Sequence, residues 1–180
     1  MSDLPVLEPG VILIHAVSKA LLPRLEWALN GLAHKPKSVR WVSLPGYLLQ
    51  TLNNTSSQSE MLACEMTFAV ECESAATLAS ALASLQAIWF EVSVPSTLQS
   101  LGQRYCYTPI LGMFHSQTDQ AGNQIFSENA LLATMRASDS FNNQDLMVRL
   151  SMLLGTEWDA QLEPLRKAAL EARYATELAS

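Results

Sequence analysis

Five polar side chains could together form a binding site: His15, Glu26, Arg104, Tyr105 and His115. Histidine changes its charge near neutral pH and can transfer protons. Arginine holds carboxylate and phosphate groups through paired hydrogen bonds. A pocket that combines these groups would suit an anionic or amide-bearing small molecule. We therefore treat the five as candidate ligand-binding residues and assign no catalytic residue.

Each of these residues also has a structural explanation. His15 lies in an apolar run, where a histidine is more often a hydrogen-bonded part of the core than a catalyst. Arg104 would then pair with a carboxylate such as Glu91 or Glu26 and hold the second half of the chain on the first. His115 precedes a polar turn and fits a surface position or a site equally well. The structural interpretation is favoured, and the case for catalysis is thin.

Other kinds of site have no support in the sequence. The three histidines form no HxH or HExxH pattern, and no CxxC pair exists, so we expect no metal. No GxGxxG, Walker or GxSxG motif is present, and we expect no cofactor. Cys64 and Cys72 fall in one predicted strand, roughly 26 Å apart, which is too far for a disulfide. With Cys106 they are interpreted as buried thiols.

The first half of the chain predicts four strands and two helices. The clearest pattern is residues 61–73, where apolar side chains alternate with polar ones as in a half-exposed strand. The other predicted strands are residues 10–17, 38–44 and 88–94, with helices beginning at Ser18 and after Ser74. This β-α-β-β-α-β order is that of a ferredoxin-like split βαβ unit, assigned to residues 1–95.

The second half, residues 96–180, is predicted to pack on that core and complete a single α+β unit. Residues 104–116 are predicted to be extended, and Asp119 begins a turn. Helices follow from Ser127, from about Asn143 to Leu154 with Gly155 as its stop, and through Pro164 to the end.

Composition excludes several classes of protein. The chain has 180 residues, of which 49 % are hydrophobic and 16 % charged, so it is not disordered as a whole. Its net charge of −6, without any basic run, argues against nucleic acid as the partner. No targeting segment is visible and no apolar run is long enough to span a bilayer, so we expect a cytoplasmic protein that does not bind membranes.

The predicted sheet leaves one face uncovered, and its first strand is apolar on both sides. Either the rest of this chain or a second copy of it must cover that face. A shared sheet face is a common way for such domains to assemble, so we expect a homodimer.

Several short motifs resemble an uncharacterised actinobacterial family, a domain of unknown function of about 160–180 residues. They include Glu26-Trp27-Ala28, Phe90-Glu91-Val92, Arg104-Tyr105, Phe114-His115 and Trp158-Asp159. The resemblance runs from His15 to Arg166 and departs from the family around Asn53. It implies a cytoplasmic actinobacterial protein and no particular activity.

The resulting hypothesis is a non-enzymatic small-molecule-binding or regulatory module. The first alternative is a small hydrolase or isomerase that uses a histidine with Glu26 and Arg104. That alternative requires Arg104 and a histidine to converge on one concave surface. The second alternative is a scaffold that binds another protein.

Overall fold

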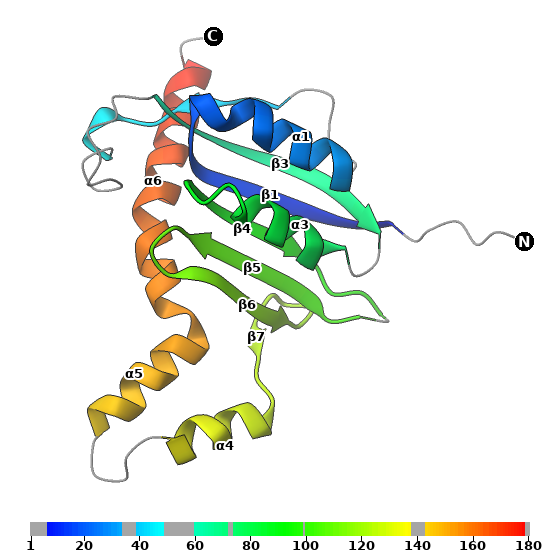
Figure 1. Ribbon diagram of the computed structural model, residues 1–180, viewed down its shortest axis with the longest axis vertical. Helices are drawn as coiled ribbons and strands as arrows, with labels where there is room; N and C mark the ends of the chain where they lie inside the picture. The colour runs from blue at the N-terminus through cyan, green and yellow to red at the C-terminus, as the bar shows by residue number, and fades with distance from the viewer. Residues whose placement is uncertain are drawn as a thin grey trace, which may run out of the picture.

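One antiparallel sheet organises the molecule (Figure 1). The computed structural model describes residues 7–33, 39–48, 60–71, 74–98, 100–137 and 143–178. Within them, seven strands stand in the order β2-β3-β1-β4-β5-β6-β7, and each neighbouring pair is antiparallel. Their bounds are β1 (Leu7–Ser18), β2 (Val42–Ser43), β3 (Met61–Glu71), β4 (Ile88–Val94), β5 (Gly102–Thr108), β6 (Gly112–Thr118) and β7 (Gln124–Ile125).

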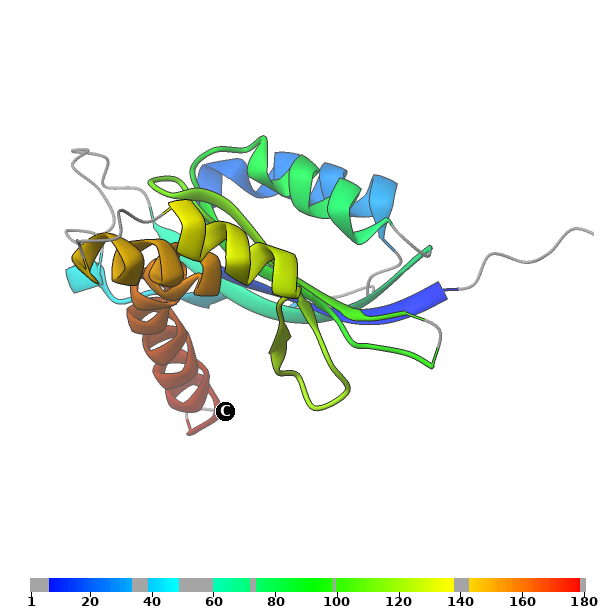
Figure 2. The same ribbon diagram turned by 90° about the horizontal axis from the view of Figure 1, so that it is seen from below.

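Helices lie on both sides of this sheet, which confirms the predicted α+β class. Figure 2 shows α1 (Leu22–Leu32) and α3 (Ala75–Ala83) on one face and α6 (Thr156–Leu178) on the other. A short 3-10 turn, η1 (Lys19–Leu21), precedes α1. The remaining helices, α4 (Glu128–Ala137) and α5 (Asn143–Leu154), extend beyond the edge of the sheet at β7 (Figure 1).

The alternation in β3 determines which side chains enter the core. Cys64, Met66, Phe68 and Val70 are buried against α1 and α3, whereas Glu65 and Thr67 are exposed on the other face. The predicted strand is therefore confirmed over Met61–Glu71. Cys72 and the departure from the family around Asn53 lie outside the described residues.

Helix α6 covers the second face of the sheet. Its apolar side chains Leu162, Leu165, Ala168 and Ala169 are buried with side chains from β1, β3, β4, β5 and β6. The sheet face that was expected to need a cover is therefore covered by a helix of the same chain. This removes the reason for expecting a homodimer through the sheet, and the dimer itself stays a prediction.

Gly155 sets the turn that sends the chain from α5 into α6, as the sequence indicated. Its φ is +71°, a conformation that residues with a side chain rarely adopt. A Cβ atom here would also lie 2.5 Å from the ring of Phe114. Directly after the turn, Trp158 Nε1 donates to the carbonyl of Gly112 (2.9 Å) and the Trp158 ring packs on Phe114. These contacts fix the start of α6 against β6.

Residues 104–116 differ from the prediction in detail. They are not one extended segment but two strands, β5 and β6, joined by a turn at residues 109–111. Thr108 Oγ1 accepts from the backbone N–H of Leu111 across this turn (3.1 Å). In the part of the chain that the structure describes, no helix is both long enough and apolar enough to cross a membrane.

Candidate functional site

A β-bulge places His15 on the face of the sheet that α6 covers. The pairing of β1 with β4 runs from Ile14 opposite Phe90 to Ala16 opposite Trp89, so His15 is the extra residue. The pairing of β1 with β3 shifts at the same place. A bulge re-aims side chains, and here it brings His15 and Glu91 of β4 within hydrogen-bond distance.

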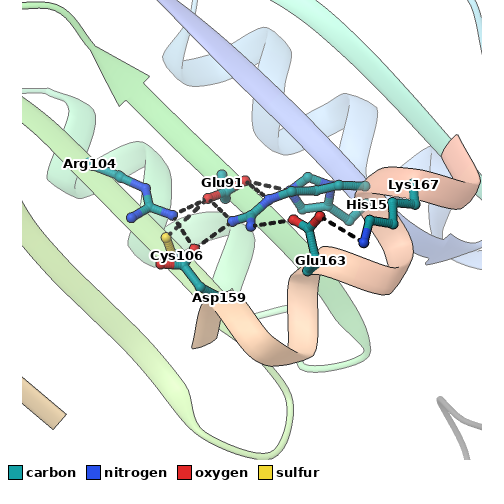
Figure 3. A network of polar contacts seen from close by, with 8 residues as sticks. His15, Glu91, Arg104, Cys106, Asp159, Glu163 and Lys167 are labelled. Atoms are coloured by element: carbon teal, nitrogen blue, oxygen red, sulfur yellow. Dashed lines mark hydrogen bonds and ion pairs between the residues drawn. The ribbon is translucent and has the colours of Figure 1, made fainter. Parts of the chain in front are cut away.

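Glu91 is the centre of a buried polar network (Figure 3). The residue is 5 % exposed, and its two carboxylate oxygens accept five hydrogen bonds. His15 Nε2 donates to Oε2 (2.7 Å), and Arg166 donates to both oxygens (Nε 3.1 Å, Nη2 2.7 Å). Arg104 Nη2 (2.6 Å) and Cys106 Sγ (3.4 Å) donate to Oε1. A carboxylate offers about four lone-pair positions, so Glu91 has none to spare.

A second carboxylate closes the network toward the solvent. Asp159 Oδ1 accepts from Nη2 of Arg104 (2.7 Å) and from Nη2 of Arg166 (2.8 Å). The two guanidinium charges therefore balance the two carboxylates. Farther out, Glu163 contacts Arg166 and Lys167, at 3.4 Å in each case (Figure 3).

The network holds its acids ionised. Burial favours the neutral form of Glu91, but hydrogen bonds from His15, Arg166 and Arg104 hold its pKa well below the usual range. The pKa of Asp159 is also lowered: burial opposes this, and the two arginines outweigh it. The pKa of the Cys106 thiol is raised, first by burial and then by the charge of Glu91.

This arrangement stabilises the fold and is poorly suited to catalysis. An acid or base must reach a substrate proton within hydrogen-bond distance. His15 is only 3 % exposed and Glu91 has no free lone pair, so neither can meet a substrate. What the network does is hold α6 onto the sheet, through Glu91 on β4, Arg104 on β5 and Arg166 on α6.

The structure divides the five candidate residues among three places. His15 and Arg104 meet at Glu91, which confirms the predicted pairing of Arg104 with that carboxylate. Tyr105 and His115 lie on the opposite face, where their rings stack with centroids 4.5 Å apart. His115 Nε2 hydrogen-bonds Oε1 of Gln103 there (2.5 Å). Glu26 is exposed on α1 and does not join either group.

The sequence analysis did not include Asp159 and Arg166 among the candidate site residues. The side chain of Asp159 binds Arg104 and Arg166. The available signal was the separation of Asp159 and Arg166 by seven residues, which places both on one face of a helix. Cys106 is the buried thiol that the sequence predicted, and it also donates to Glu91.

A small pocket lies beside the network at the N-terminal part of α6. Its volume is about 240 Å³, and we call it the α6 pocket. Leu48, Trp89 of β4 and Ile110 of the β5–β6 turn form one side. The other side comes from α6, with Ala160, Gln161, Pro164 and Leu165. Trp89 precedes Glu91 by two residues on the same strand face, so the pocket and the network are neighbours under one helix.

A larger open groove lies on the other side of the molecule, between α1 and α3. Its volume is about 950 Å³, and Trp27 on its rim is 80 % exposed. Trp27 is therefore not part of the core. Among the described residues, no buried side-chain polar atom without a partner belongs to this groove.

One comparison with known proteins identifies a family. A family model described as a protein of unknown function (DUF3145) matches residues 11–176. The chain belongs to the DUF3145 family. The match includes the whole Glu91 network and the α6 pocket. No curated protein and no solved structure matches the chain. The predicted kinship with a domain of unknown function is thereby confirmed, and the actinobacterial origin stays a prediction.

Proposed function

We propose that this protein is a non-enzymatic module that binds a small molecule in the α6 pocket. The observation that carries the proposal is the pocket itself, which is lined mostly by apolar side chains of α6, β4 and the β5–β6 turn. Small-molecule sites are typically apolar cavities with a few polar groups that fix the orientation of the ligand.

The closed Glu91 network supports a role without catalysis. Its arginines, carboxylates and histidine satisfy one another, so they offer no nucleophile and no free acid or base to the pocket beside them. Arg104 and His15 lie on one face of the sheet, but the enzyme alternative requires them to converge on one concave surface. Because that histidine is buried behind Glu91, the shared face does not favour an active site.

The α6 pocket is favoured over the larger groove because of its position. The pocket lies against α6, so a bound molecule would add contacts between the helix and the sheet.

Indole is a suitable probe for this proposal because it is small, largely apolar and neutral. Its binding is measured by saturation-transfer NMR with the wild-type chain and with Ala160→Trp. Ala160 is exposed on α6 at the rim of the pocket, so the tryptophan fills the pocket from outside at little cost to the fold. We expect binding to the wild type and loss of binding in Ala160→Trp.

A matched control is Ala175→Trp, an exposed alanine of the same helix that does not line the pocket. This variant should bind indole as the wild type does. No binding to the wild-type chain, or equal binding to Ala160→Trp, would sink the proposal.

We further propose that residues 1–95 form a ferredoxin-like βαββαβ core. The elements β1, α1, β2, β3, α3 and β4 follow one another in that order, and their strands are neighbours as β2-β3-β1-β4. Both helices of this set lie on one face (Figure 2). A truncated chain ending near residue 95 would lack α6, which covers one face of the sheet, so truncation does not test the core. An experimental structure of a relative tests it, by showing whether the same βαββαβ order and strand neighbours are present.

A further inference from the structure

Two helices that contact each other form an arm beyond the edge of the sheet at β7 (Figure 1). They are α4 (Glu128–Ala137) and α5 (Asn143–Leu154), and we call them the α4–α5 arm. Among the described residues, no side chain of either helix is buried. Six of their large apolar residues are between 39 % and 62 % exposed, namely Leu131, Met135, Met147, Val148, Met152 and Leu154. The arm therefore carries apolar surface that the rest of this chain does not cover.

Helix α5 shows this most clearly, because apolar residues occupy most of its circumference. They lie on three sides at helical spacing, with Leu146, Leu150 and Leu153 on the first, Met147 and Leu154 on the second, and Val148 and Met152 on the third. The first side is half-buried and the other two are exposed. A helix that is apolar nearly all round is normally buried on all those sides. The sequence of α5 thus suits contacts that a single chain does not make.

The exposed area of the arm matches what one side of a stable interface needs. With ordinary residue areas, its six exposed apolar residues add up to roughly 600 Å² of accessible surface. A standard interface buries about 800 Å² on each partner, of which about 60 % is apolar. The arm alone therefore supplies the apolar area of one side of such an interface.

The charges of the arm favour a second arm as its partner. Each helix has one acid and one base: Glu128 and Arg136 in α4, and Asp145 and Arg149 in α5. The pair in α5 is joined within the helix, from Arg149 Nε to Asp145 Oδ2 (2.9 Å). The two helices are therefore neutral, although the whole chain carries a net charge of −6. Two arms meet without the like-charge repulsion that opposes other contacts between two copies, and a strongly charged partner finds no net counter-charge there.

From these observations we infer that two copies of this chain form a homodimer through their α4–α5 arms, whose apolar side chains pack against one another. The same surface then serves both partners, as in any interface with two-fold symmetry. This contact is separate from the sheet face that α6 covers, and no residue of the arm lines the α6 pocket. The inference therefore does not depend on the proposed function.

Sedimentation equilibrium of the wild-type chain and of Met147→Glu/Met152→Glu tests this inference. The double variant places a charge on each exposed side of α5, where no buried side chain is disturbed. We expect a wild-type dimer with a mass of twice 19.7 kDa. The dissociation constant of the variant dimer should rise at least about a hundredfold, because dimerisation would bury the new charges.

A milder double variant and a control outside the arm complete the experiment. Met147→Gln/Met152→Gln adds no charge and should also weaken the dimer, so it decides the matter if circular dichroism shows that the glutamates unfold α5. Trp27→Glu adds a charge at an exposed apolar residue on the rim of the groove between α1 and α3, and it should stay dimeric.

Three results would overturn the inference. The first is a monomeric wild type, and the second is a dimer that persists unchanged in both arm variants. The third is dissociation by Trp27→Glu as well as by the arm variants, which would place the arm in the partner's groove between α1 and α3 instead of on the partner's arm.

Discussion

Replacing Glu91 by glutamine tests whether the buried network holds α6 on the sheet. The substitution keeps the size of the side chain, so it opens no cavity. It removes the negative charge that two arginines and a histidine contact. It also directs an amide N–H₂ at groups that are themselves donors. Both arginines then keep Asp159 as their shared partner, which is 40 % exposed in its side chain.

The expected loss follows from burial. Removing one partner of a buried ion pair costs about 3–5 kcal/mol. The side chains of Arg104 and Arg166 are 21 % and 27 % exposed, so water compensates part of their lost interaction. We therefore expect the lower end, about 3 kcal/mol, which is roughly a hundredfold change in the unfolding equilibrium. Urea unfolding followed by circular dichroism measures this quantity.

Glu65→Gln is the matched control. Glu65 also joins the sheet to α6, by an ion pair with Arg173, but its side chain is 48 % exposed. An exposed pair contributes at most about 1 kcal/mol. A loss below about 1 kcal/mol in Glu91→Gln, or equal losses in the two variants, would refute the assignment of the network as the main attachment of α6.

Three further predictions concern the same region. The pKa of Glu91 is lower in the folded protein than in the unfolded chain, so its contribution to stability is present above about pH 4.3 and is lost as the pH falls toward the native pKa. Between about pH 4.5 and 2, the wild type should therefore lose more stability than Glu91→Gln in acid unfolding monitored by circular dichroism. Parallel unfolding curves would contradict this. Gly155→Ala should cost about 2 kcal/mol or more in urea unfolding, because φ is positive and the new Cβ meets the Phe114 ring, whereas a neutral effect would show that the turn relaxes. Cys106 should resist thiol reagents until the chain unfolds, because burial raises the pKa of its thiol. Peptide mapping after labelling checks this, and rapid modification of the native protein would show that α6 opens.

Local structure could be predicted well wherever neighbouring residues determine it. The alternation in β3, the turn at Asp119 and the cap by Ser127 depend on residues a few positions apart. The stop at Gly155 is of the same kind, since only glycine adopts its φ without strain. These features were predicted correctly because they depend on interactions between residues close in the sequence.

The site could be predicted only in part because its residues meet across long separations. The pairing of Arg104 with Glu91 spans 13 residues and was anticipated from charge, but Glu91 and Arg166 are 75 residues apart. The bulge at His15 has no signal in an apolar run, yet it brings His15 to Glu91. The pairing of β5 with β6 places His115 opposite Tyr105, on the other face of the sheet. Neither position follows from residue types alone.

The most direct test of the account is native mass spectrometry of the protein purified gently from its own cells, in parallel with Ala160→Trp. The account expects the wild-type chain to carry one added mass, identified after release as a small molecule that fits the mostly apolar α6 pocket. The variant should carry none, and the same spectra report the subunit number. A bare wild-type chain, or the same added mass on Ala160→Trp, would contradict the assignment of the α6 pocket as the binding site.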